Sequence, residues 1–549
     1  MDKDKDRLFE GWESFFGSER IYSKEMDRRS FLLASSKVAA LSLGLTLAGS
    51  LKGERVLAAE PKFKAYPFTL GIASGDPLPD GVVLWTRLAP DPLNGGGMPN
   101  HDVPVRWEVA TDERFRDVVR HGVEFARAEL AHSVHVEVDG LQPGRIYYYR
   151  FKAGSEISPV GRTKTLPAFG SDVSKLVFAF ASCQHYEEGY FSAYRHMAKE
   201  DLDLVFHLGD YIYEYATVEN RVRRHNGPEI MTLEDYRNRH ALYRSDTDLQ
   251  AAHTAFPWVV VNDDHEVENN YAGLIPEKDQ PLEPFVARRA AAYQAYYEHM
   301  PLRRSSLPNG PNIQLYRRFS YGNLADFHVL DTRQYRDDQA NGDGTKPPTP
   351  ESTDPNRTLL GKEQESWLLE GLGRSKARWN VLAQQVFFCK RDFKSGTEEG
   401  YSMDAWDGYI ANRNRILDFA TENGISNLVV LTGDVHSNWA NEIKADFNNP
   451  DSPNLGVEFV GTSITSGGDG VDMNNSDQAV LAENPHIKFC NRQRGYVRCT
   501  VTPDQWQADY QVLPYVSRPD AAIFTRASFQ VDHGNPGLRK IYDSLVTTS

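Results

Sequence analysis

Short apolar runs alternate with amphipathic segments from residue 171 onward. Six apolar runs are bounded by polar residues, and they cover 175–184, 202–210, 256–266, 326–334, 379–385 and 427–436. Nearly continuous apolar runs of this length are typical of strands covered on both faces. Residues 285–300, 359–373 and 412–424 lie between or beside them, are rich in helix formers, and predict helices, the last ending at Gly424. This alternation predicts an α/β sandwich, followed by antiparallel strands over 457–468 and 495–513.

The pattern differs between residues 66 and 166. Here short strand-like runs alternate with turn signals, most clearly in "GVVLWTRL", "VPVRWEVA" and "RIYYYRF". This predicts a small β-sandwich of fibronectin type III character over residues 60–170, which we expect to carry no chemistry. The catalytic domain is then expected over residues 171–549.

The first part of the chain, residues 1–59, has the pattern of an export signal. Arg28 and Arg29 precede a short apolar segment, and the small residues Ala58 and Ala59 follow as a cleavage-like site. The pattern predicts a twin-arginine signal peptide and a passing interaction with the twin-arginine translocase. The mature protein is then secreted, either free or associated with the cell wall. A membrane anchor is the alternative, but the apolar run is short for a spanning helix.

Net charge narrows the possible partners. The 549 residues carry a formal charge of −15, with a pI near 5.6. A nucleic-acid backbone is therefore a poor partner, and no polybasic face points to a membrane surface. An anionic substrate would need a local positive centre, which bound metal ions supply. We expect a monomer without a nucleic-acid-binding domain.

Four cysteines are too few for a disulfide-stapled scaffold in a chain of this length. In an oxidising compartment we expect one or two bridges, with Cys490 and Cys499 as the favoured pair. Cys183 is different because it ends an apolar run.

Polar residues that end the apolar runs identify one shared site. In open α/β sheets, ligands bind outside the carboxyl ends of the strands, where several loops converge. Five strand ends deliver a carboxylate, thiol or imidazole, and the polar residues found there are Cys183, Asp210, Tyr213, Asp263, Asp264, His265, Glu266, Asp331, Arg333, Asp434 and His436. Clustered negative charge beside a buried sheet is costly unless cations neutralise it. The sequence therefore predicts a metal site.

The residue types indicate which metals. A phenolate from Tyr213 and a thiolate from Cys183, together with Asp210, suit Fe(III). Oxygen donors from the candidate ligands Asp264, Asn270 and Asp407 suit a hard cation such as Ca²⁺. Asp434 and His436 are two residues apart, so in extended backbone they face the same way and could serve two metal positions, or one metal and its outer contacts.

An ordered series of motifs resembles the PhoD-like metallophosphatase family. The motifs are "FASCQ", "HLGDYIYEY", "DDHEVENNYAG", "DTRQYRDDQANGDG", "SMDAWDGY", "LTGDVHSNW" and "FVGTSITSGGDG". The resemblance extends over essentially the whole chain. It implies a phosphomonoesterase and phosphodiesterase with one Fe³⁺ and two Ca²⁺, laid out like the purple acid phosphatases and calcineurin-like enzymes.

The resemblance also implies roles for single residues. Cys183, Asp210 and Tyr213 would hold iron, with Asp210 bridging to a first calcium. Asp264 would be a calcium ligand, and Asp434 and His436 would be the paired terminal ligands. Asn270 and Asp407 would serve the second calcium, with Asn269 and Asp404 as alternatives. Asn262 departs from the family pattern, in which a Trp is usual.

The expected reaction is phosphoester hydrolysis. A hydroxide or oxide held by iron would attack phosphorus, calcium would hold the non-bridging oxygens, and either His265 or metal-bound water would assist departure of the alkoxide. Arg333 would contact either substrate phosphate or a ligand carboxylate. Two alternatives stay open: a secreted phosphodiesterase or phospholipase acting on wall polymers or phospholipids, and a calcium-dependent binding protein without catalysis.

Overall fold

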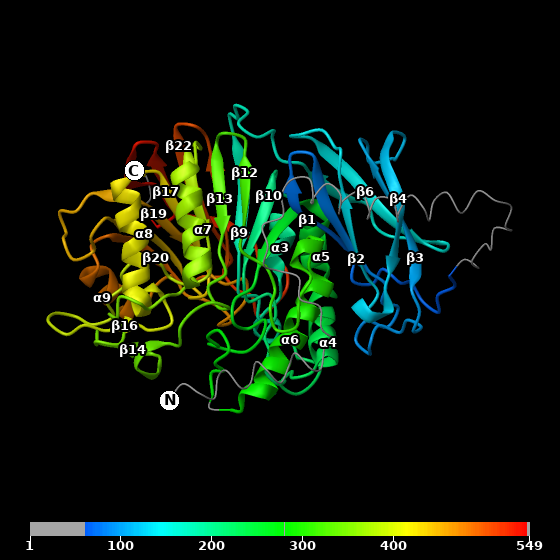
Figure 1. The fold of residues 1–549 in the computed structure, drawn as a ribbon, viewed down its shortest axis with the longest axis horizontal. Helices are drawn as coiled ribbons and strands as arrows, with labels where there is room; N and C mark the ends of the chain where they lie inside the picture. Colours follow the sequence, from blue (N-terminus) through cyan, green and yellow to red (C-terminus); the bar gives the residue numbers. More distant parts are fainter. Residues whose placement is uncertain (1–60, 279, 546–549) are drawn as a thin grey trace, which may run out of the picture. The chain divides into compact units, whose positions relative to one another are not determined.

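The largest sheet has ten strands, with parallel strands in its middle and antiparallel strands on both sides (Figure 1). The computed structural model describes residues 61–278 and 280–545. The order is β24 (Asn535–Asp543), β23 (Phe524–Asp532), β22 (Gln505–Val512), β21 (Gly495–Val501), β9 (Leu176–Ala181), β10 (Leu204–Leu208), β11 (Pro257–Val261), β1 (Ile72–Leu78), β2 (Gly81–Arg87) and β5 (Ser133–Val138). Strands β9, β10, β11 and β1 are mutually parallel, so the carboxyl ends of β9, β10 and β11 lie along one edge.

A second sheet has seven strands and is parallel in its centre. Its order is β12 (Arg317–Tyr321), β13 (Ala325–Val329), β15 (Trp379–Ala383), β17 (Leu428–Thr432), β19 (Asn454–Val460), β18 (Asn438–Lys444) and β20 (Ile487–Asn491). All six predicted apolar runs form strands, namely β9, β10, β11, β13, β15 and β17. The antiparallel expectation holds for β21 and β22 but only partly for β19, which pairs parallel with β17 and antiparallel with β18.

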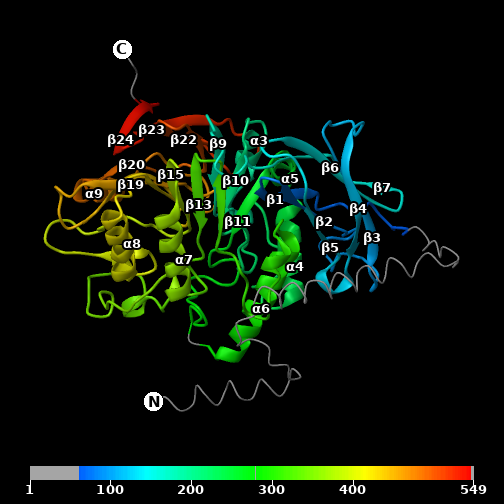
Figure 2. The same cartoon turned by 45° about the horizontal axis from the view of Figure 1, so that its top comes forward.

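Helices cover the outer faces of both sheets (Figure 2). Beside the ten-stranded sheet lie α3 (Ser192–Met197), α4 (Leu233–Arg244), α5 (Thr247–Ala255) and α6 (Leu282–His299), and beside the seven-stranded sheet lie α7 (Gly361–Arg374), α8 (Ile410–Glu422) and α9 (Asn475–Glu483). The three predicted helices are confirmed as α6, α7 and α8. Gly424 follows α8 with a φ of 65°, the left-handed conformation that favours glycine at a helix end.

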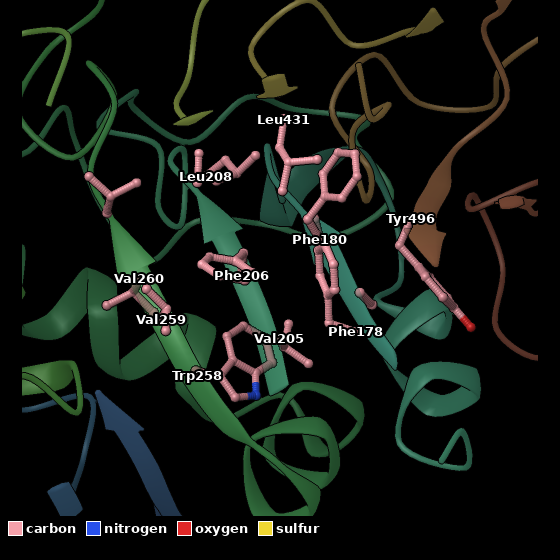
Figure 3. Packing of buried hydrophobic residues seen from close by; sticks show 14 of the residues in the cluster. Phe178, Phe180, Val205, Phe206, Leu208, Trp258, Val259, Val260, Leu431 and Tyr496 are labelled. Atoms are coloured by element: carbon pink, nitrogen blue, oxygen red, sulfur yellow. The ribbon is translucent and has the colours of Figure 1, made fainter. Parts of the chain in front are cut away.

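The main hydrophobic core lies between the two sheets. Phe178 and Phe206 of the first sheet contact Phe327 of the second, with ring centroids 5.5 and 4.8 Å apart. Figure 3 shows Phe178, Phe206 and Leu431 in this core. Along β17 the side chains alternate, because Leu431 faces this core while Val430 faces the core under α7 and α8. Burial on both faces explains why these strands have continuous apolar sequences.

The N-terminal strands form a sandwich that shares a sheet with the rest of the protein. One layer contains β4 (Val118–Ala126), β3 (Val103–Ala110), β6 (Ile146–Ala153), β7 (Glu156–Ile157) and β8 (Gly161–Lys164). Its hydrophobic core is completed by residues of β1, β2 and β5. Because β1 pairs with β11, the second layer is one end of the ten-stranded sheet, so the module is not attached by a linker alone.

The predicted disulfide between Cys490 and Cys499 is wrong. Cys490 lies in β20 and Cys499 in β21, which belong to different sheets and different hydrophobic cores. All four cysteines, each within the described residues, are free and buried.

The two ends of the chain differ in what the structure describes. Beyond Pro514, β23 and β24 extend the edge of the large sheet, so this segment packs as strands. The predicted signal peptide lies outside the described residues. Among the helices that are described, none is long and apolar enough to span a membrane.

Candidate metal centre

The carboxyl ends of β9, β10, β11 and β17 converge on one cluster of possible ligands. Three groups of side chains each place their ligand atoms within 4.8 Å of one another, and they are Cys183 with Asp210 and His436, Asp210 with Asp264 and His265, and Asp263 with Asp264 and Asp434. Asp210 belongs to the first two groups and Asp264 to the last two. The three groups therefore form a continuous series joined by shared carboxylates.

Buried Glu266 fixes the strand ends that carry two of these carboxylates. Its carboxylate accepts hydrogen bonds from the backbone N–H groups of Asp210 at 3.2 Å, Tyr211 at 2.5 Å and Asp263 at 2.7 Å. Its side chain is therefore engaged by backbone donors, and its role is to hold the ends of β10 and β11 together.

The backbone of the candidate ligands is strained. Cys183, Asp210, Asn270, Asp434 and His436 have φ values of 60°, 56°, 51°, 62° and 53°. Residues other than glycine rarely adopt this left-handed conformation, and each instance costs about 1–3 kcal/mol. Such strain persists where the surroundings impose it, and it gathers at functional sites.

One end of the cluster combines thiol, phenol and imidazole donors. The Tyr213 hydroxyl donates to Asp210 Oδ2 at 2.8 Å and lies 3.2 Å from His436 Nε2. Burial raises the pKa of the Cys183 thiol well above its usual range, and Asp210 adds to the effect. Burial lowers the pKa of His436 to about 3, so its imidazole is neutral, the form that binds metals. A thiolate at Cys183 therefore requires a neighbouring positive charge, which a metal ion would supply.

The carboxylates at the other end lack enough hydrogen-bond donors. Burial, with the neighbouring Asp264 adding to it, raises the pKa of Asp210 to about 7, and burial and nearby carboxylates also raise the pKa of Asp263 and Asp434. Three buried oxygen atoms, Asp210 Oδ1, Asp263 Oδ2 and Asp264 Oδ1, have no hydrogen-bond partner among the described residues. Buried charge of one sign with unpartnered oxygens fits a site for hard cations.

Arg333 provides the main positive charge in the cluster. Its guanidinium binds Asp404 through two hydrogen bonds of 2.7 and 2.9 Å and Asp263 at 2.5 Å. It also lies 3.7 Å from Asp264 and 3.6 Å from Asp434. The residue is 0% exposed. Of the two roles expected for Arg333, these contacts favour binding of the clustered carboxylates over contact with substrate.

His265 lies at the centre of the cluster with an acidic partner. Its Nδ1 is 2.8 Å from Glu214 Oε2, and its ring lies 4.1 Å from that of Tyr213. Burial opposes protonation of His265, but Glu214, Asp264 and Asp210 outweigh it and raise the pKa of the imidazole well above its usual range. Glu214 is not among the predicted site residues, although it directly follows Tyr213.

The candidates for the second calcium differ in their surroundings. The backbone N–H of Asn270 donates to Asp264 Oδ2 at 2.7 Å, so Asn270 borders the cluster. Asp407, on the short helix η6 (Trp406–Tyr409), belongs to none of the three groups, and its carboxylate is bound by Arg413 at 2.7 Å and by the backbone N–H of Arg391 at 2.9 Å. Its alternative, Asp404, is bound by Arg333.

Two further residues have clear structural partners. Asn269 donates its backbone N–H to Glu214 Oε1 at 2.9 Å, so it supports the acid beside His265. Asn262 is fully buried, and its amide donates to Asp263 O at 3.1 Å and to the Tyr271 hydroxyl at 3.2 Å. The amide of Asn262 therefore donates two hydrogen bonds, whereas the indole ring of a Trp has only one N–H donor.

Fold and site together define an α/β sandwich protein with a candidate metal centre at the carboxyl ends of its parallel strands. Comparison with known proteins then identifies the family: residues 178–510 match the PhoD-like phosphatases and residues 54–167 match the N-terminal domain of PhoD-like phosphatases, so the chain belongs to the PhoD-like phosphatase family. The predicted resemblance is confirmed.

Two relatives agree with this assignment. Alkaline phosphatase D of Bacillus subtilis (strain 168) is 63% identical over 546 residues, which is 98% of this chain and 94% of that protein. A solved structure described as PhoD superposes with a TM-score of 0.88 at 65% identity, over 89% of this chain and 94% of that chain. The chain is therefore an enzyme, and the prediction of the alkaline phosphatase and phosphodiesterase class is confirmed.

Proposed function

We propose that the protein hydrolyses phosphomonoesters and phosphodiesters at a centre of one Fe³⁺ and two Ca²⁺. The observation that carries this proposal is the series of three ligand groups joined by Asp210 and Asp264. The three groups share two carboxylates, so cations bound along the series would lie next to one another, and the unpartnered oxygens of Asp210 and Asp264 lie at the shared points.

The donors divide by type between the two kinds of metal. Cys183, Tyr213 and His436, with Asp210, would hold iron, because thiolate, phenolate and imidazole suit a transition metal. Asp264, Asp434 and Asn270 offer oxygen atoms for calcium, and Asp210 would bridge to it. Asp263 joins the oxygen donors at that end. Asp407 is left out of the proposed set because Arg413 already neutralises it.

The chain's own residues prepare the site for a phosphoester. When bound, the metals supply Lewis-acid activation of water and neutralise charge on the phosphoryl group. Glu214, Asp264 and Asp210 raise the pKa of His265, and its imidazole would donate a proton to the departing alkoxide oxygen. Glu214 fixes the orientation of that imidazole through Nδ1, which leaves Nε2 as the donating atom. Arg333 holds the carboxylates of Asp264 and Asp434 in place.

The cellular setting and the finer fold relationships are part of the same proposal. The twin-arginine pattern with Arg28 and Arg29 supports export of the folded protein and secretion after cleavage. Two packed mixed sheets with the site at their carboxyl edge support a layout like that of calcineurin-like enzymes and purple acid phosphatases. The two layers around β3 and β6 support a fibronectin type III-like character for the N-terminal sandwich.

The test is phosphate release from a monoester and a diester before and after calcium chelation. We expect both activities to fall together on chelation and to return when Ca²⁺ is added back, because one centre serves both substrates. Full activity in excess chelator would contradict the calcium assignment. Calcium-dependent binding of the ester without release of phosphate would favour a binding protein.

A further inference from the structure

Three consecutive residues after β10 border the centre and make different contacts. Tyr213 binds Asp210 and His436, and Glu214 binds His265. Tyr215 lies beside both, with its ring 5.2 Å from that of His265 in an edge-on arrangement and 6.3 Å from that of His185 in a stacked one. The third residue of the series therefore borders the proposed proton donor.

The ring of Tyr215 is the part of this series that reaches solvent. Tyr215 is 39% exposed, whereas Tyr213 and Glu214 are each 2% exposed. Its hydroxyl makes no hydrogen bond to any described residue, while the Tyr213 hydroxyl contacts Asp210, His436 and Ser466. Part of the Tyr215 ring, and its hydroxyl, therefore remain available for contact with a ligand.

The backbone of Tyr215 is nevertheless firmly held. Its carbonyl oxygen accepts from Arg239 Nη1 at 3.0 Å and lies 3.0 Å from His225 Nδ1. Both residues are buried, Arg239 at 1% exposure and His225 at 4%. Buried Glu187 accepts a hydrogen bond from the backbone N–H of His225 at 2.8 Å, so the segment that contacts the Tyr215 carbonyl is itself held in place. An exposed ring on a fixed backbone is preorganised to contact a ligand at low entropic cost.

Tyr215 also lines a cavity together with Glu214, the residue that holds His265 Nδ1. The cavity has a volume of about 300 Å³, and apart from Tyr215 and Met231 its lining is polar or charged: Glu214, Glu229, Glu268, Glu277, Lys278, Gln280 and Arg288. That volume is at the lower end of the range for ligand cavities. A phosphoester whose leaving oxygen lies at His265 would bring its organic group near the Tyr215 ring, which is 5.2 Å from the imidazole.

We propose that Tyr215 determines specificity for the leaving group, favouring esters of uncharged, ring-bearing alcohols over esters of small alkyl alcohols. This inference rests on the proposed phosphoester hydrolysis. The phenol ring would pack against a ring in the leaving group, a contact that contributes a free energy equivalent to about a two- to tenfold change in binding. The phosphoryl group itself would be bound by other residues, so the chemical step would be unaffected.

The test compares benzyl phosphate with ethyl phosphate, which both release an alkoxide but differ in the ring. Phosphate release gives kcat and KM for the wild-type enzyme and for Tyr215→Leu and Tyr215→Phe. We expect Tyr215→Leu to raise KM for benzyl phosphate about two- to tenfold while kcat and both constants for ethyl phosphate stay nearly unchanged. Tyr215→Phe should keep the wild-type preference, because it keeps the ring.

Controls separate this role from a structural one. Phe169→Leu removes an aromatic ring that is 71% exposed and is not among the residues of the centre, so it should change neither substrate's constants. Metal content and inhibition constants for benzylphosphonate and ethylphosphonate are measured on the same variants. An equal effect of Tyr215→Leu on both substrates, or none on either, would overturn the specificity assignment. If the wild-type enzyme released no phosphate from either substrate, the proposed function would be wrong. The specificity role of Tyr215, which rests on that function, would then fail as well.

Discussion

Arg333→Gln tests how far one guanidinium offsets the repulsion among the clustered carboxylates. In the absence of metals, Arg333 binds Asp263 and Asp404 directly and lies within 3.7 Å of Asp264 and Asp434. Removing one partner of a buried ion pair costs about 3–5 kcal/mol, and here several carboxylates lose the same partner. We therefore expect the free energy of unfolding of the calcium-free protein at pH 7.5 to fall by at least about 3 kcal/mol.

The assay is urea unfolding with and without saturating Ca²⁺. Bound cations would take over part of the neutralisation, so the loss should shrink when Ca²⁺ is present. The loss in the free energy of unfolding caused by Arg333→Gln should also shrink as the pH falls. Arg333 lowers the pKa of Asp264 and Asp434, so its removal raises both values and the carboxylates take up protons earlier on acidification. The pH window runs from neutrality down toward the ordinary carboxyl pKa near 4.

Arg413→Gln is the matched control. Arg413 is as buried as Arg333 within a few per cent and binds a single carboxylate, that of Asp407, at 2.7 Å. Its loss should destabilise the protein to an extent that is independent of Ca²⁺, because Asp407 lies outside the three ligand groups. The reasoning is refuted if Arg333→Gln costs less than about 1 kcal/mol, or if its cost is the same with and without Ca²⁺.

Three other predictions concern single side chains. Cys183→Ser should lower the iron content and the activity together, since the hydroxyl is a poorer ligand than the thiolate; unchanged iron would exclude Cys183 as a ligand. Glu214→Gln removes a carboxylate that raises the pKa of His265, so the alkaline limb of the pH–kcat profile should move to lower pH, and an unmoved limb would show that His265 does not donate the proton. Reducing agent should leave the urea midpoint unchanged because all four cysteines are free, and a lower midpoint would reveal a disulfide.

The central strands could be predicted because burial on both faces leaves a clear mark on the sequence. The runs that became β10 and β17 are apolar except for His207 and Thr432, and each is followed by Gly-Asp at the sheet edge. The strands β23 and β24 were not predicted, because they lie at or next to an edge and their residues are partly exposed. The disulfide prediction failed because separation along the chain does not reveal that Cys490 and Cys499 belong to different sheets.

The site could be predicted where residues lie directly at strand ends. Cys183, Asp210 and Asp264 gather for this reason, and their convergence follows from parallel strand order. Asp404 and Asp407 could not be distinguished, because they are three residues apart around a short helix and only the fold places one at Arg333 and the other at Arg413. Glu214 and Tyr215 were missed because their roles depend on how His265, which is distant in sequence, packs against them.

The most direct test of the centre is the metal content of Asp210→Asn. Asp210 is shared by the thiol-containing group and the carboxylate group, so the account predicts that Asp210→Asn loses both iron and calcium when purified protein is measured by elemental analysis. Cys183→Ser, changed at one group only, should lose iron and retain most of its calcium. Loss of a single kind of metal from Asp210→Asn, or of neither, would contradict a centre joined by that carboxylate.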